Sequence, residues 1–246
     1  MRIFASVCYD GTAYQGWQKQ PEAPTIQDEI EKVLSKILDT EIKIYGSGRT
    51  DSGVHAFAQT FHFDVDKLDM GLSKLKYAVN RLLPLDIKIN SFQFVDDDFH
   101  ARFSAKEKVY RYVIRFGERN PFLRNYEYNL AVSVEFEEFV DAIKKFEGTH
   151  NFQDFNSKPE DEDGFIRTIK SIDVFFNEKE GSLTIEFTGD GFMRYMIRDM
   201  VGTALAVAQH KESIDFIGNH LAEGKERDIV SYKAPSSGLY LKEVRY

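Results

Sequence analysis

The sequence predicts an α+β fold in which strands and helices follow one another twice in the order β-α-β-β-α-β. Short runs in which apolar and polar residues alternate are typical of strands, and longer runs with apolar residues three or four apart are typical of helices. Both kinds of run recur in the same order in the two halves of the chain. At 246 residues the chain can form one large domain or two small ones.

In the first half, alternation predicts a strand over residues 2–9, and apolar spacing predicts a helix over about 25–38. Thr25, followed three residues later by Asp28, forms a pattern similar to a capping box at the start of that helix. Apolar spacing also predicts a second helix over about 72–83, which Pro84 stops. The remaining predicted strands of this half are 42–45, 57–65 and 87–94.

The second half repeats this order without repeating the sequence. The predicted strands are 109–116, 166–176, 183–187 and 239–244, and the predicted helices are about 136–146, 192–209 and 214–221. The β-α-β-β-α-β order is the ferredoxin-like pattern, so we expect two such halves, 1–103 and 104–246. No linker rich in Pro or Ser separates them, so we expect them to pack tightly or to share a continuous sheet.

Composition restricts the class of protein. Cys8 is the single cysteine, so a disulfide or a cysteine metal site within the chain is excluded. The longest nearly apolar run, residues 200–208, is too short to span a bilayer, and because residues 1–2 lead straight into the first predicted strand we expect no signal peptide. We therefore expect a soluble cytoplasmic protein with no membrane partner.

The net charge of −8 argues at first against a nucleic-acid partner. Positive charge is nevertheless concentrated in residues 100–124, which hold seven Lys and Arg against two Glu. Acidic residues gather elsewhere, at 96–98 and 160–163. A basic stripe of this kind can bind phosphates or can be a solvated strand face, and charge alone does not separate the two.

The loop over residues 46–56 lies between two predicted strands and carries three glycines in eight residues. Arg49 and Asp51 stand at its centre. A loop with Gly and Asp is most often a simple turn in which the carboxylate caps backbone N–H groups. This loop is longer than the two to five residues of an ordinary hairpin, so we interpret it as a candidate site.

The string Gly-Arg-Thr-Asp-x-Gly-Val-His-Ala at 48–56 resembles the active-site motif of the TruA-type tRNA pseudouridine synthases. Five more segments resemble the family in the same order: 9–18, 99–112, 148–152, 192–202 and 234–241. Two departures stand in the fourth of them, Asp199 where the family usually has Asn and Arg194-Tyr195 where His is common. Segment 148–152 is predicted as a loop.

The resemblance implies the pseudouridine synthase fold with a central antiparallel sheet. It also implies conversion of uridine to pseudouridine in RNA, usually at positions 38–40 of the tRNA anticodon arm, by a homodimer whose shared cleft takes the RNA. The reaction breaks the N1–C1′ bond and forms a C5–C1′ bond with no net gain of atoms or electrons. We therefore expect no cofactor and no metal.

By resemblance, Asp51 is the catalytic nucleophile, and Arg198 keeps it ionised through a charge-assisted pair. Tyr110 stacks on the base and takes or relays the C5 proton. Whether Asp51 attacks C1′ or C6, or deprotonates C2′, stays open. The residues expected to bind substrate are Arg49, Arg102, Lys108, Tyr110 and Leu239.

Other classes stay open beside this prediction. A paralogue acting on ribosomal RNA fits the same motifs. A non-catalytic RNA-binding protein is possible, because ferredoxin-like domains are widely used for that purpose. A glycoside hydrolase also uses a carboxylate nucleophile but needs a second carboxylate about 5–9 Å away, for which Asp10 is the one candidate.

Overall fold

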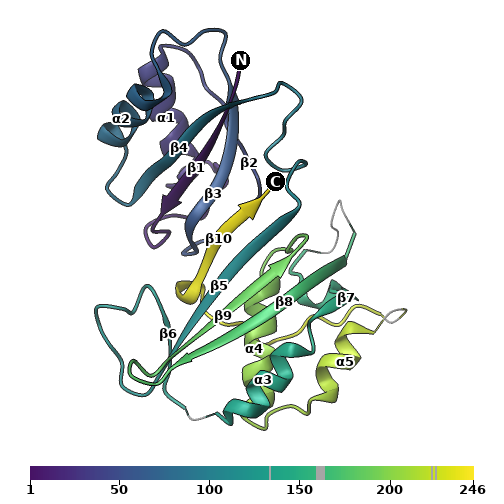
Figure 1. The fold of residues 1–246 in the computed structure, drawn as a ribbon. Helices are drawn as coiled ribbons and strands as arrows, with labels where there is room; N and C mark the ends of the chain where they lie inside the picture. Colours follow the sequence, from purple (N-terminus) through teal and green to yellow (C-terminus); the bar gives the residue numbers. More distant parts are fainter. Residues whose placement is uncertain (133, 159–163, 223, 225) are drawn as a thin grey trace. The chain divides into compact units, whose positions relative to one another are not determined.

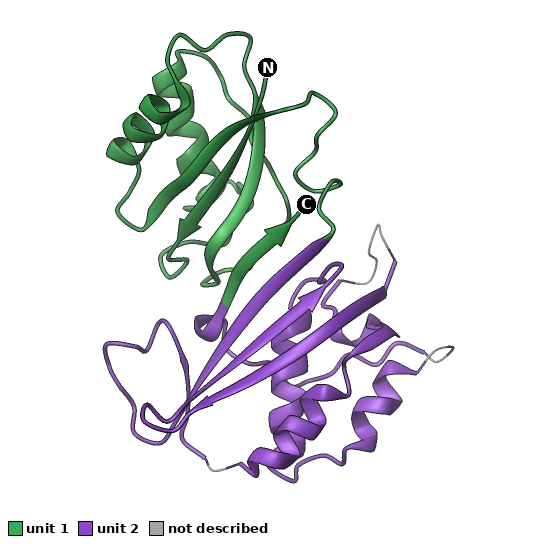
Figure 2. Ribbon diagram, viewed as in Figure 1, with its two compact units in different colours: residues 1–106, 240–246 green, residues 107–239 purple. Residues whose placement is uncertain are grey.

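The computed structural model describes the chain except residues 133, 159–163, 223 and 225. The described chain divides into two compact units: unit 1 is Met1–Lys106 with Tyr240–Tyr246, and unit 2 is Glu107–Leu239 (Figure 2). The last residues, Tyr240–Tyr246, thus belong to the unit that holds the first strand, whereas the predicted second half comprised all of 104–246. We describe each unit by itself.

Unit 1 is an antiparallel sheet with two helices packed side by side against it (Figure 1). Its strands follow the order β4-β1-β3, and β2 and β10 both pair with β3, β10 in parallel. The strands are β1 (Arg2–Tyr9), β2 (Tyr45–Gly46), β3 (His55–Asp64), β4 (Ile87–Val95) and β10 (Leu239–Arg245), and the helices are α1 (Ile26–Leu38) and α2 (Leu72–Leu82). As predicted, α1 is capped by Thr25, whose Oγ1 accepts from the Asp28 amide at 3.4 Å.

The predicted strand 42–45 is wrong for most of its length, because β2 covers Tyr45–Gly46 alone. The backbone amide of Ile42 donates to Ser35 Oγ at 2.9 Å, and that of Ile44 donates to Glu31 Oε1 at 3.1 Å. These donors are bound by side chains of α1 instead of by a neighbouring strand. The alternation in this segment therefore reflects burial of Ile42 and Ile44 against the helix.

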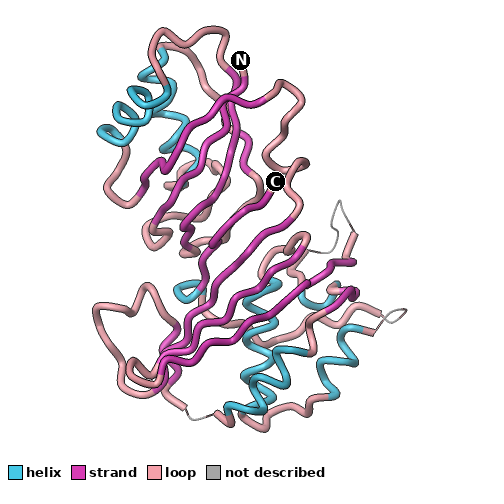
Figure 3. Tube along the Cα trace, in the orientation of Figure 1, coloured by secondary structure: helices cyan, strands magenta, loops and turns pink. Residues whose placement is uncertain are grey.

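Unit 2 contains antiparallel strands in the order β5-β9-β8-β7, with α3 packed on α4 (Figure 3). The short strand β6 pairs with β5 in parallel. The strands are β5 (Glu107–Phe116), β6 (Tyr128–Leu130), β7 (Gly148–Asn151), β8 (Ile166–Asn177) and β9 (Ser182–Gly189). The helices are α3 (Phe136–Lys144), α4 (Met196–Ala208) and α5 (Asp215–Leu221), with short 3-10 turns η1 (Gln153–Phe155) and η2 (Ser236–Gly238). The predicted α+β class with largely antiparallel strands is confirmed.

Two predictions for unit 2 are corrected. Segment 148–152 is not a loop throughout, because β7 pairs with β8 from Gly148 to Asn151. The helix predicted over 192–209 begins only at Met196, because Tyr195 has φ 68°, in the left-handed region that side chains rarely adopt. Arg194 and Tyr195 therefore precede α4 instead of lying on it.

Candidate active site

The Asp51 loop connects β2 to β3 in unit 1, and its first part is held by a buried glutamine. Ser47 Oγ donates to Gln59 Oε1 at 2.7 Å, and Gln59 Nε2 donates to the Gly48 carbonyl at 3.0 Å. The Ser47 amide also donates to the Thr60 carbonyl at 2.8 Å. These bonds connect the residues before Asp51 to the middle of β3.

A second loop, residues 11–18, holds the part of the Asp51 loop around the carboxylate. The Trp17 amide donates to the Thr50 carbonyl at 3.1 Å, and the Gly53 amide donates to the Tyr14 carbonyl at 3.3 Å. The hydroxyls of Tyr9 and Thr50 are 2.8 Å apart in the interior. Residues on both sides of Asp51 are therefore fixed by a segment far away in the sequence, which preorganises the carboxylate.

Gly16 is the point of closest approach between these two loops. Its φ is 89°, and a Cβ atom there would lie 2.5 Å from the Thr50 carbonyl oxygen and 3.1 Å from the Asp51 carbonyl carbon. Only glycine fits this backbone conformation and this distance without moving the Asp51 loop.

Asp10 lies at the other end of the loop, against His55. Its Oδ1 accepts from the Thr12 amide at 2.9 Å and from Thr12 Oγ1 at 2.5 Å, and it lies 3.1 Å from His55 Nδ1. The Gly11 amide donates to the same His55 nitrogen at 3.1 Å. Asp10 thus shapes its own turn and the end of the Asp51 loop.

Arg49 and Arg102, two of the predicted RNA contacts, are both exposed in unit 1. The segment that carries Arg102 is fixed by His62, whose Nδ1 accepts from the Ala101 amide at 3.2 Å. Burial, with a smaller contribution from the neighbouring His100, lowers the pKa of His62 to about 4. The imidazole is therefore neutral at pH 7 and can act as this acceptor.

The predicted basic segment 100–124 is less positive than its sequence indicates. Arg111 pairs with Glu186 at 2.8 Å, and Arg115 pairs with Glu127. Both carboxylates lie outside the segment, so their neutralising effect was not visible in its local charge. The Arg111 and Arg115 side chains therefore contribute to the packing of unit 2 as well as to its surface charge.

Tyr110 and Lys108 lie on β5 in unit 2, opposite Phe187 and Gly189 of β9. Two residues apart on a strand, their side chains leave the same face of the sheet. The Tyr110 ring is 8 % exposed and meets the Phe192 ring edge-on at 5.2 Å. Leu239, the predicted base contact, is buried at the start of β10.

Arg198 is held by the backbone of the segment that precedes β10. Its Nε donates to the Ala234 carbonyl at 2.8 Å, and the Ala234 amide donates back to the Arg198 carbonyl at 2.9 Å. The Tyr112 hydroxyl donates to the next carbonyl, that of Pro235, at 2.7 Å. One such bond fixes the direction of a guanidinium and does not exhaust its five N–H donors.

Gly202 brings α4 close enough for this contact. A Cβ atom at Gly202 would lie 2.7 Å from the Tyr232 carbonyl carbon and 2.8 Å from the Lys233 nitrogen, both of them backbone. We expect Gly202→Ala to destabilise the protein by about 1–3 kcal/mol through overpacking. The control Gly218→Ala, on α5 with nothing within 4 Å of the added Cβ, is expected to stabilise it by about 0.5–1 kcal/mol. The free energy of unfolding of both variants in urea measures these effects. Equal changes in the two variants would contradict the close approach of α4 to the backbone of residues 232–233.

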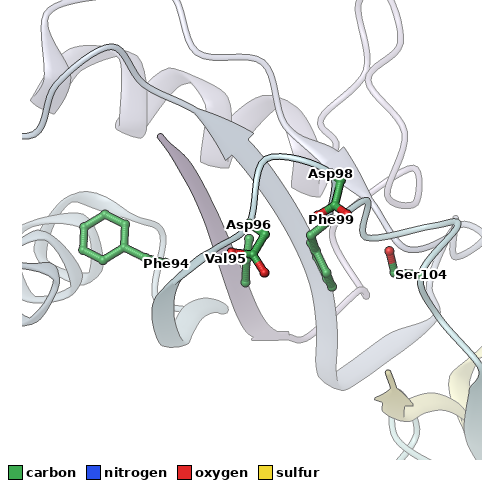
Figure 4. A pocket seen from close by; sticks show the side chains of 6 residues that line it. All are labelled: Phe94, Val95, Asp96, Asp98, Phe99 and Ser104. Atoms are coloured by element: carbon green, nitrogen blue, oxygen red, sulfur yellow. The ribbon is translucent and has the colours of Figure 1, made fainter.

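Asp51 belongs to unit 1, and Tyr110 and Arg198 belong to unit 2, so the pairing of Asp51 with Arg198 stays a prediction. Within the described residues, no group of three or more His, Cys, Asp or Glu is placed to hold a metal ion. A pocket in unit 1 lies at the end of β4 and contains none of the predicted site residues (Figure 4). Asp96 and Asp98 line it, so its charge does not suit a phosphate.

One contact between side chains was not predicted. Lys233 lies beside Tyr195, and no local pattern joins two residues so far apart in the sequence. Among the described residues, no helix is long and apolar enough to cross a membrane.

The chain is similar to known proteins along its whole length. The family described as "tRNA pseudouridine synthase" matches residues 5–104 and 142–246. Proteins named "tRNA pseudouridine synthase A" match over 100 % of the chain: that of Streptococcus mutans is 39 % identical over 99 % of its own length, and that of Geobacillus sp. is 43 % identical over 98 %. Among solved structures, an H/ACA RNP bound to a substrate RNA matches with a TM-score of 0.39 and 16 % identity, over 82 % of this chain and 44 % of that chain. A structural likeness at that level supports no conclusion.

Proposed function

The chain belongs to the tRNA pseudouridine synthase family, and we propose that it converts uridine to pseudouridine at positions 38–40 of the tRNA anticodon arm. The observation that carries this proposal is the full-length match to relatives of that name, at 38–43 % identity. The loop that carries Asp51 supports the proposal further, because backbone hydrogen bonds hold it in place and a nucleophile needs a fixed direction of approach.

The proposed reaction is an isomerisation within one nucleotide. The N1–C1′ glycosidic bond breaks, the uracil turns, and a C5–C1′ bond forms. C5 then loses its proton and N1 gains one, so atoms and electrons balance without a co-reactant. The enzyme must supply a carboxylate near the sugar or base, a group that handles the C5 proton, and contacts that hold the flipped nucleotide.

Asp51 supplies the carboxylate in this proposal. Its flanking residues are held by Tyr14 and Trp17, so the loop keeps its shape while the carboxylate reacts. Arg198 pairs with it and holds it as the anion, since a neighbouring guanidinium lowers the pKa of a carboxyl. The bond from Arg198 Nε to Ala234 supports this role, because an arginine fixed by backbone is preorganised for a charge-assisted pair.

The other predicted residues hold and process the base. Tyr110 stacks on it and takes or relays the C5 proton, and its edge-on contact with Phe192 supports a fixed ring. Leu239 packs on the same base. Arg49, Arg102 and Lys108 bind RNA phosphates, and Arg49 and Arg102 are exposed as such a role needs.

We also propose that the protein acts in the cytoplasm as a homodimer whose shared cleft takes the RNA. An anticodon arm is long and must be held away from the reacting base. A two-fold pair is the commonest assembly of soluble proteins, and it doubles the surface available for that contact.

Mapping pseudouridine in total RNA from cells with and without this protein tests the proposal. Loss of the modification at tRNA positions 38–40 alone is the expected result. Loss in ribosomal RNA with tRNA unchanged would instead identify the ribosomal paralogue. No loss anywhere, together with tRNA binding by the purified protein, would favour a non-catalytic RNA-binding protein.

A further inference from the structure

Three cationic side chains gather around one aromatic ring at the start of α4. The Tyr195 ring centroid lies 4.0 Å from Lys233 Nζ, 4.8 Å from Arg194 Cζ and 5.1 Å from Arg198 Cζ. Arg194 is also fixed by a hydrogen bond from its NH2 group to the Tyr195 hydroxyl at 3.0 Å. All these residues belong to unit 2, and we call Arg194, Tyr195 and Lys233 the Tyr195 cluster.

The backbone at Tyr195 is held in a conformation that favours this arrangement. Its φ of 68° lies in the left-handed region, where residues with side chains are uncommon and are found disproportionately at functional sites. This conformation ends the loop from β9 and begins α4, so the ring precedes the helix that carries Arg198. The position of the cluster is therefore set by the backbone and by cation–π contacts together.

One carboxylate, that of Asp199, also lies against the Tyr195 cluster. Asp199 is 1 % exposed, and its Oδ1 forms an ion pair with Lys233 Nζ at 3.7 Å. Arg194 and Lys233 are both exposed, so solvent reaches both. Like charges gathered on one ring repel one another, and an anionic ligand would relieve that repulsion. In a chain with a net charge of −8, a local group of cations of this kind is a candidate binding site for a polyanion.

We propose that Arg194 and Lys233, held on the ring of Tyr195, bind a backbone phosphate of the substrate RNA beside the site that Arg198 serves. This rests on the proposed function for the identity of the polyanion. Arginine suits a phosphate because its planar N–H groups match the phosphate oxygens, and lysine adds a point charge. Phosphate contacts fix register and orientation without reading sequence, so the cluster positions the RNA for catalysis.

Equilibrium binding of fluorescent tRNA to the full chain, measured over a series of KCl concentrations, tests the cluster. A cation that contacts a phosphate contributes about 0.7–0.9 to the slope of log affinity against log salt concentration. Arg194→Gln and Lys233→Gln are each expected to weaken binding at low salt and to lower that slope by about this amount, and Arg194→Lys to restore most of it. Lys179→Gln, which removes an exposed lysine in the β8–β9 turn, is the control and should leave the slope unchanged.

The inference would be overturned if both Gln variants had the same salt slope as the wild type. It would also be overturned if the Lys179→Gln control lowered the slope by the same amount as they do. Circular dichroism and thermal unfolding show whether each variant is folded, and Lys233→Arg keeps the charge if Lys233→Gln does not fold. Pseudouridine formation is measured on the same samples. Salt-dependent binding that needs the cluster, without any pseudouridine from the wild type, would contradict the proposed function while supporting the phosphate site. If the wild type forms pseudouridine but its salt slope equals that of the Arg194 and Lys233 variants, the proposed function is supported and the phosphate site is contradicted.

Discussion

Asp51→Asn is expected to abolish pseudouridine formation, lowering the rate by roughly 10⁴-fold or more, as removal of a nucleophile does in other enzymes. The amide is nearly the same size as the carboxylate but is neither a nucleophile nor a base. Asp51 is half-exposed, so the free energy of unfolding should change by no more than about 0.5 kcal/mol. Single-turnover release of tritium from C5-labelled tRNA measures the loss.

Asp10→Asn is the matched control for this variant. Asp10 lies in the neighbouring loop, and an Asn oxygen can still accept from the Thr12 amide and hydroxyl. We expect this variant to keep most of the activity. A comparable rate in Asp51→Asn would contradict the role of Asp51, and equal loss in both variants would point to a pair of carboxylates acting together.

Gly16→Ala is expected to have the second-largest effect, because the added methyl group must displace the Asp51 loop. The Cβ atom would lie 2.5 Å from the Thr50 carbonyl oxygen, and the residue would keep its φ of 89° only under strain. We expect a loss of kcat on the order of 10²-fold, as a shift of about 1 Å in a reacting group produces. Steady-state kinetics on unmodified tRNA checks it.

Gly117→Ala separates strain from displacement. Gly117 has a φ of 83° but nothing within 4 Å of an added Cβ, so this variant bears the backbone cost alone. That cost is about 1–2 kcal/mol of stability, and kcat should stay near the wild-type value. Similar kcat values for the two variants at a temperature where both are folded would show that Gly16 does not hold the Asp51 loop in place.

The elements that sequence patterns predicted well are those whose own side chains decide the structure. Alternation over 2–9 predicted β1, and the apolar spacing with Thr25 as cap predicted α1. The wrong predictions concern segments whose structure depends on hydrogen-bond partners far away in the sequence. Residues 42–44 alternate like a strand, but Glu31 and Ser35 bind their amides. β7 is short, and its pairing with β8 gives it its strand structure.

The candidate site shows the same division. The motif around Asp51 could be found from the string alone, because its glycines, arginine and carboxylate are adjacent. The support from Tyr14 and Trp17 could not, since it consists of backbone hydrogen bonds that depend on no side-chain type. The hydrogen bond from Arg198 to Ala234 could not be predicted either, because every residue has a backbone carbonyl and the residue type does not show which one accepts. The start of α4 was missed because no pattern signals a left-handed Tyr195.

The most direct test of the account is nucleotide-resolution mapping of pseudouridine in an unmodified tRNA transcript incubated with the purified wild-type chain and with Asp51→Asn. We expect pseudouridine at positions 38–40 with the wild type and none with the variant. Equal modification by both proteins would contradict the role of Asp51, and no modification of tRNA by the folded wild type would contradict the proposed function itself.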